Sequence, residues 1–159
     1  MNEELQRYRT EQAEAWLSKV RRAVGYAKAL EESAAAQFAA ADNLKAMDYS
    51  AVRVTTTPTP DQIPNAVIAH IEAGKALGEV AASASERVAQ AARALAQMDD
   101  SIEAMCLQLY YVDALDTWEH VCVKMHYSYD GMMKLRRRAL LHAYDVMPHV
   151  ERDSIPTAM

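Results

Sequence analysis

Three basic side chains, Lys134, Arg136 and Arg137, lie in one short run of the sequence, KLRRR. On a helix they could neutralise the phosphates of a nucleic acid, and an arginine can also donate two hydrogen bonds to guanine. Residues 117–144 hold five basic and two acidic residues, a balance of +3, whereas the whole chain has a net charge of −5. A basic segment on an acidic body is typical of a protein in which only one small part reads DNA.

The elements that position these side chains are predicted by the segment from Asp116 to Leu141, which has the spacing of a helix-turn-helix. Asp116 and Glu119 have the spacing of a capping box that starts the first helix, and Ser128 is the expected N-cap of the second. Tyr127 is expected to close the turn. The apolar residues at helical spacing that give the two helices a common core are Val121, Cys122, Met125, Met132 and Leu135. We expect Cys122 at the point where the helices cross, because only a small side chain fits there.

We expect the second helix to lie in the major groove, where Lys134, Arg136 and Arg137 contact phosphate or guanine. The other candidate DNA-binding residues are Thr117, Trp118 and Lys124 against backbone phosphates, Ser128 at the helix start, and Tyr129, Asp130 and Met133 towards base edges. This hypothesis requires the second helix to stand open to solvent. Arginines held against the acidic long helices would contradict it.

The same segment resembles the fourth region of bacterial primary sigma factors. The positions that match the pattern of that region are Thr117, Trp118, Glu119, Val121, Met125, Ser128, Met132, Leu135, Arg138, Ala139 and Leu140. With the tail from Tyr144 to His149, the C-terminal part is still more similar to phage and prophage regulators of the ArpU/RinA type. The resemblance implies a helical N-terminal part, a C-terminal helix-turn-helix and a role as a DNA-binding transcriptional regulator in a bacterial cytoplasm.

Two positions depart from the sigma-factor pattern. His126 stands in the turn where the pattern usually has glycine, so a left-handed turn here must accept a Cβ atom. Gly131 stands where sigma factors usually have a long side chain. The base contacts of sigma factors therefore cannot be transferred residue by residue.

Two long helices are expected before this segment, at about 2–47 and from Pro60 or nearer Asn65 to Met98. One seam of mostly apolar residues keeps heptad spacing in each helix. It consists of Ala13, Trp16, Val20, Ala23, Ala27, Leu30, Ala34, Gln37, Ala41 and Leu44 in the first, and of Leu77, Ala81, Ala84, Val88, Ala91, Leu95 and Met98 in the second. The simplest arrangement is an antiparallel hairpin, but pairing between two chains as a homodimer satisfies the same pattern.

The sequence thus predicts an all-α chain with a long helical hairpin over 1–98, a helix-turn-helix domain over 99–148 and a polar tail over 149–159 that is partly disordered. The hairpin contains a connector with three prolines at 48–64. Asp99–Ser101 is either a cap or a slight break before a short apolar helix, Ile102–Tyr111, that we expect to pack behind the motif.

Other function classes have weaker support. Cys122 and His126 have the i, i+4 spacing of metal ligands, but four converging ligands are needed and we expect no metal, no cofactor and no enzymatic activity. No run of eighteen apolar residues predicts a membrane span. The alternatives that remain are a sigma-like adaptor that binds RNA polymerase, a small-terminase-like DNA-packaging component, and a purely structural coiled coil.

Overall fold

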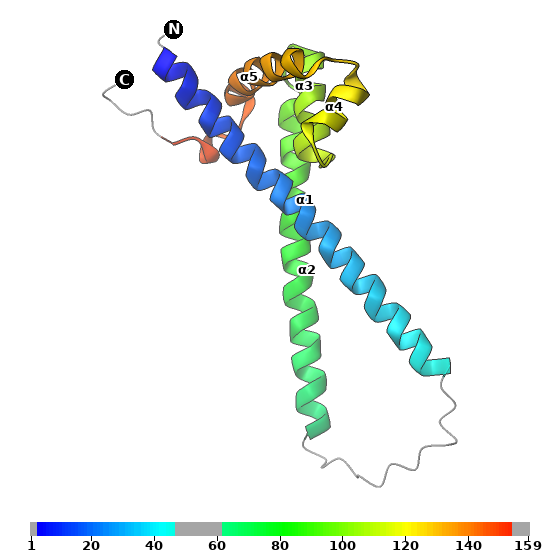
Figure 1. Ribbon diagram of the computed structural model, residues 1–159. Coiled ribbons are helices and arrows are strands. Elements are labelled where there is room, and N and C mark those ends of the chain that lie inside the picture. The colour runs from blue at the N-terminus through cyan, green and yellow to red at the C-terminus, as the bar shows by residue number, and fades with distance from the viewer. Residues whose placement is uncertain (1–2, 47–61, 154–159) are drawn as a thin grey trace. The chain divides into compact units, whose positions relative to one another are not determined.

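A computed structural model describes the backbone of residues 3–46 and 62–153 (Figure 1). It describes their side chains too, except at 37–38, 40–46 and 62–73. Its elements are α1 (Glu3–Ala46), α2 (Gln62–Leu95), α3 (Ser101–Leu107), a π-helical turn η2 (Gln108–Val112), α4 (Trp118–Met125), α5 (Tyr129–Val146) and a 3-10 turn η3 (His149–Glu151). The described residues contain no strand, so the predicted all-α class is confirmed. Most of the predicted connector, 47–61, lies outside the described residues.

The chain divides into two compact units, and the division differs from the predicted one. The first unit joins residues 1–25 to 84–159, and the second unit is 26–83. The start of α1 therefore belongs with the helix-turn-helix rather than with a separate hairpin. The physical reason is a shared hydrophobic core.

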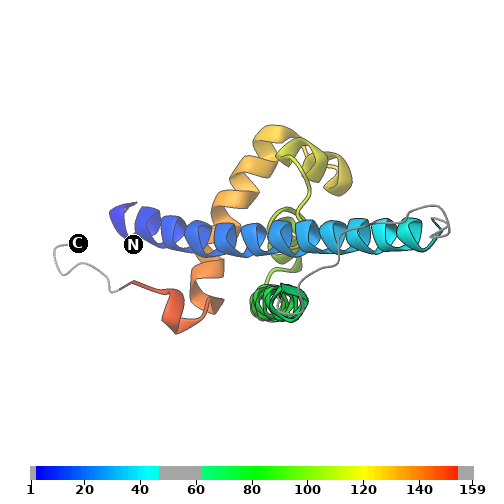
Figure 2. The same ribbon diagram turned by 90° about the horizontal axis from the view of Figure 1, so that it is seen from below.

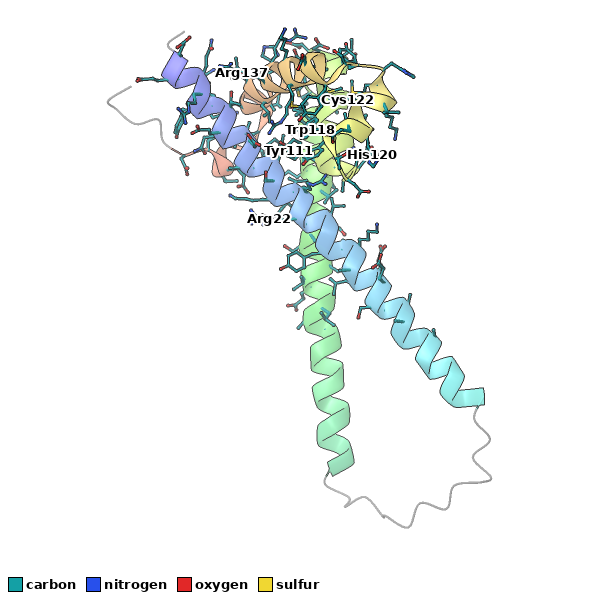
Figure 3. The ribbon with its side chains drawn as sticks, in the orientation of Figure 1. Arg22, Tyr111, Trp118, His120, Cys122 and Arg137 are labelled. Atoms are coloured by element: carbon teal, nitrogen blue, oxygen red, sulfur yellow. The ribbon has the colours of Figure 1, made fainter. Side chains whose placement is uncertain are left out.

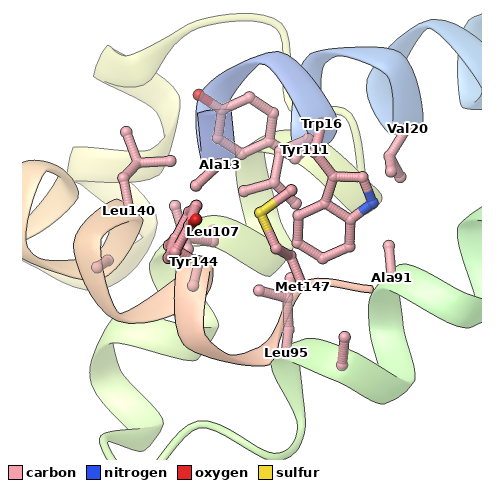
Figure 4. Packing of buried hydrophobic residues seen from close by; sticks show 14 of the residues in the cluster. Ala13, Trp16, Val20, Ala91, Leu95, Leu107, Tyr111, Leu140, Tyr144 and Met147 are labelled. Atoms are coloured by element: carbon pink, nitrogen blue, oxygen red, sulfur yellow. The ribbon is translucent and has the colours of Figure 1, made fainter. Parts of the chain in front are cut away.

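That core, called the body core below, collects buried residues from α1, α2, α3, η2 and α5 (Figure 4). Its largest side chains are Trp16, Leu17, Leu95, Leu107, Tyr111, Leu140, Tyr144 and Met147. Each such side chain contributes about 1.5–3 kcal/mol when it leaves water, so the unit depends on segments distant in sequence. The predicted seam is thus buried in the first unit, where α1 crosses the end of α2 (Figure 1).

The second unit lacks such burial among its described side chains. Residues 26–36 and 74–83 are exposed or half-buried throughout. Tyr26 is 67% exposed, Leu77 50% and Val80 51%. The exposed apolar surface of this unit therefore includes Ala34 and Leu77 of the predicted seam, while the seam residues Ala27, Leu30 and Ala81 are half-buried.

The first part of the predicted tail, from His149 to Asp153, has a defined structure. η3 and the residues after it lie against α1: the Lys19 ammonium contacts the Glu151 carboxylate at 2.8 Å, and the Tyr8 hydroxyl donates to the backbone oxygen of Asp153 at 3.1 Å. The side chains of Arg9 and Arg152 both stack on the ring of Tyr144 at 5.1 Å. Residues 154–159 lie outside the described residues.

Among the described helices, none has the length and apolar character needed to cross a bilayer.

Candidate nucleic-acid interface

α4 begins at a different cap from the one predicted. The Thr117 hydroxyl, not the Asp116 carboxylate, accepts from the backbone N–H of His120 at 3.4 Å. Hydrogen bonds from its own N–H and from the Thr117 side chain lower the pKa of Glu119. The predicted capping box of Asp116 and Glu119 was therefore wrong: Thr117 is the cap, and Glu119 lies two residues after it. A threonine with extended backbone geometry (φ −137°, ψ 161°) satisfies the helix start directly.

The turn between α4 and α5 has the geometry that the sequence required of it. His126 adopts the left-handed conformation (φ 58°, ψ 42°), so the turn does accept a Cβ atom in the conformation that favours glycine. Its backbone N–H points back to the last carbonyls of α4, and the N–H of Tyr127 donates to the Cys122 oxygen at 3.0 Å. The Ser128 hydroxyl then accepts from the N–H of Gly131 at 3.2 Å, which confirms the predicted N-cap of α5.

A second hydrophobic cluster, called the motif core below, holds α4 and α5 against α3. Its buried residues are Cys106, Leu109, Val121, Cys122, Met132 and Leu135. The small Cys122 side chain is only 7% exposed, as its predicted place at the helix crossing requires. Burial raises the pKa of both thiols, that of Cys106 to about 12, so neither is activated as a nucleophile.

The outer side of α5 carries part of the predicted contact set. Met132, Leu135 and Ala139 are buried, so Asp130, Lys134 and Arg137 at i, i+4 and i+7 occupy the opposite side and are exposed. We call these three residues the open stripe; Figure 3 labels Arg137 on α5. Within the described part of the chain neither Lys134 nor Arg137 forms an ion pair. Tyr129, at the start of the helix, is 50% exposed, and Met133 is half-buried.

Arg136 is half-buried against α1, whereas its neighbour Arg137 is exposed. Its guanidinium pairs with the Glu14 carboxylate of α1 and lies 5.1 Å from the centre of the Trp118 ring. It is also close to Tyr111, whose pKa burial raises to about 12 while Arg136 acts in the opposite sense. Because these three partners belong to α1, α4 and η2, Arg136 joins the motif to the body. The condition that all the arginines stand open is therefore met only in part.

Arg138 is also engaged by carboxylates, although it carried no predicted contact. Its Nε donates to Glu103 of α3, which is 1% exposed, and Nδ1 of His142 lies 2.5 Å from the other oxygen of that carboxylate. Asp100, which does cap α3, lies 3.8 Å from the Arg138 guanidinium. Glu103 lies three and four residues before Cys106 and Leu107 in an apolar run, so helical spacing places it on their buried side. A buried carboxylate needs a basic partner, and this signal could have identified its pairing with Arg138.

The other candidate DNA-binding residues, on α4 and at the helix caps, also include both a side chain packed inside the motif and exposed ones. Trp118 is half-buried and stacks on Tyr110 with ring centres 4.0 Å apart, so its ring supports the helix from inside (Figure 3). Thr117 and Ser128 are caps whose side chains remain exposed, and Lys124 is exposed near the end of α4.

One residue that matters for this arrangement carried no sequence signal. Arg21 of α1 donates to the backbone oxygens of Tyr110, Leu115 (2.9 Å) and Asp116 (3.3 Å), and its guanidinium lies 4.2 Å from the Tyr110 ring centre. The loop that leads into α4 is therefore fixed by a side chain from α1. An arginine on a helix surface gives no hint of such a contact before the fold is known.

Among the described residues no group of three His, Cys, Asp or Glu side chains could hold a metal ion. No family model, no curated protein and no solved structure matches this chain. The case for a function is thus carried by the helix-turn-helix, its caps and the open stripe.

Proposed function

We propose that this protein is a DNA-binding transcriptional regulator of phage or prophage type that places the first turns of α5 in the major groove. The observation that carries the proposal is the open stripe, Asp130, Lys134 and Arg137, on the solvent side of a capped helix-turn-helix. The N-terminal part of the second helix is the part that meets base edges in such motifs. A regulator of this type works in the cytoplasm of the bacterial host and catalyses no reaction.

The contacts of Arg136 and Trp118 narrow the set of residues proposed to touch DNA. Lys134 and Arg137 are the proposed phosphate or guanine contacts, because they are basic, exposed and unpaired within the described residues. Tyr129 and Asp130 would face base edges, where a carboxylate can accept from cytosine. Lys124 and the Thr117 and Ser128 caps lie towards the flanking backbone in this arrangement.

We further propose that the regulator binds as a homodimer through the second unit. The apolar side chains of Tyr26, Leu77 and Val80 are half or more exposed, and burial between two chains would remove them from water. A symmetric dimer would read two half-sites about one helical turn, 34–36 Å, apart. Sedimentation equilibrium tests this part: Leu77→Glu should dissociate the dimer, whereas Glu79→Lys, at another exposed position of α2, should not.

Binding to DNA is tested with the double variant Lys134→Ala/Arg137→Ala against the control Arg22→Ala/Lys28→Ala. Both variants remove two exposed positive charges, but the control pair lies on α1 outside the helix-turn-helix. With a duplex pool of random sequence, the first variant should lose about tenfold or more in affinity, and the salt dependence should flatten by about two charges. Equal affinity of the two variants across salt concentrations would contradict the proposal.

A second candidate function is binding of RNA polymerase through the same motif. Val123 on α4 is 74% exposed, and Met105 on α3 is 56% exposed, so the motif offers apolar as well as basic surface. Retention of polymerase by the full-length protein, lost in Val123→Asp but not in Lys134→Ala/Arg137→Ala, would favour this function over DNA binding.

A further inference from the structure

The first part of α1 crosses α5, as Figure 2 shows. A groove of about 600 Å³ separates the two helices, and Arg136 and Arg137 line it from α5. The α1 side of this groove carries four carboxylates, those of Glu3, Glu4, Glu11 and Glu14, and one guanidinium, that of Arg7, which pairs with Glu11 at 2.8 Å. We call the four glutamates the acidic wall.

Arg137 lines two grooves between α1 and α5. A second groove, of about 260 Å³, is lined by Gln6 and Thr10 of α1 and by Lys134 and Arg137 of α5. α1 therefore borders both basic residues of the open stripe. Glu14 of the acidic wall is already paired with Arg136, whereas Arg137 has no ion-pair partner among the described residues.

A duplex bound to α5 would meet this wall. The major groove is about 12 Å wide and a helix with its side chains is about 10–12 Å across, so one helix fills the groove. A second helix at its side must lie against the phosphate backbone, which carries one negative charge per about 1.7 Å of duplex. Carboxylates in that position repel the phosphates and lower the local positive potential of Lys134 and Arg137.

We infer that the acidic wall is an intramolecular competitor of DNA phosphate and sets the affinity of α5 for DNA. The inference rests on the proposed function and adds its regulation: α5 binds DNA weakly while the first turns of α1 lie alongside, and tightly once their charge is removed or they move aside. The competing group is part of the same chain, so the effect is independent of protein concentration.

The experiment neutralises three exposed members of the wall in the full-length protein, Glu3→Gln/Glu4→Gln/Glu11→Gln. Glu14 is left in place because its ion pair with Arg136 supports the fold. The matched control is Glu31→Gln/Glu32→Gln/Glu79→Gln, which changes the net charge equally at exposed positions of the second unit. Glu31 lies about 25 Å further along α1 than Glu14, at 1.5 Å per residue. All variants are titrated with a random-sequence duplex of about 30 base pairs at several salt concentrations.

We expect the wall variant to bind about tenfold tighter than the wild type at about 0.1 M salt, with the advantage fading at higher salt, while the control changes affinity by less than about threefold. Equal affinities of the wall variant and the control, with wild-type binding that still requires Lys134 and Arg137, would overturn the competitor and leave the proposed function intact. Absence of binding by the wild type and by both triple variants would overturn the proposed function itself, and the competitor with it. Binding by the wall variant alone would support both.

Discussion

The two hydrophobic clusters of the first unit are built on different principles. The motif core takes all its buried residues from one continuous stretch, Cys106 to Leu135. The body core gathers residues from Ala13 to Met147 and includes α1, α2 and α5. A helix-turn-helix whose local core is small is thus completed by a cluster that reaches across the chain. The start of α1, as far as Gly25, therefore belongs to the same compact unit as the motif.

The largest expected effect comes from the centre of the body core. Trp16 is 3% exposed, and Trp16→Ala should lower the free energy of unfolding by about 3–5 kcal/mol, through lost burial and the cavity left behind. If the two clusters form one cooperative unit, the unfolding transitions followed by far-UV and by near-UV circular dichroism should have the same urea midpoint. Arg22→Ala, at an exposed position of α1 in the same unit, is the control and should change stability by less than about 0.5 kcal/mol. Two separated transitions in the Trp16 variant would break the comparison by showing that the motif folds without the body.

A slightly smaller effect is expected in the motif core, and its cysteines can report it. Met132 is fully buried with its sulfur 3.5 Å from the Cys106 thiol, and Met132→Ala should cost about 2–4 kcal/mol. Burial raises the pKa of Cys106 to about 12, so the native thiol is both shielded and protonated at neutral pH. Alkylation should be slow in the wild type and faster in the variant, because it requires opening of the cluster. A faster rate in Met132→Ala than in an equally destabilised Trp16 variant would show that the motif core opens by itself.

The contrast between the clusters also explains what could be predicted from the sequence. Short-range signals succeeded: the Ser128 cap, the left-handed turn at His126 and the small Cys122 at the crossing all depend on residues a few positions apart. Long-range contacts could not be predicted, because the spacing of apolar residues along a helix does not say which other helix they will pack against. The pairing of Arg136 with Glu14 and the anchoring of the α3–α4 loop by Arg21 are of this kind. The open stripe was predictable for Lys134 and Arg137, but the different position of Arg136 was not.

A moderate effect separates the two candidate caps of α4. Thr117→Ala should lower the free energy of unfolding by about 1 kcal/mol, since the hydroxyl that accepts from His120 is lost. Asp116→Ala, one residue earlier, should have almost no effect, because within the described residues its side chain caps nothing. Urea unfolding of both variants checks the pair. A larger loss for Asp116→Ala than for Thr117→Ala would restore the capping box that the sequence suggested.

The smallest effect on stability is expected at Gly131, where a substitution gains helix propensity but disturbs the cap of α5. Replacing a helical glycine by alanine stabilises by about 0.5–1 kcal/mol. A Cβ atom at this position, however, would lie 3.0 Å from the Ser128 hydroxyl, so the cap must shift, and loss of such a cap costs about 1 kcal/mol. Gly131→Ala alone should therefore change stability by less than about 0.5 kcal/mol. In a Ser128→Ala background the conflict is absent, and the same substitution should show its full stabilising effect. A full gain in the wild-type background would mean that the Ser128 hydroxyl moves aside at no cost, and that the motif core holds the start of α5 without its cap.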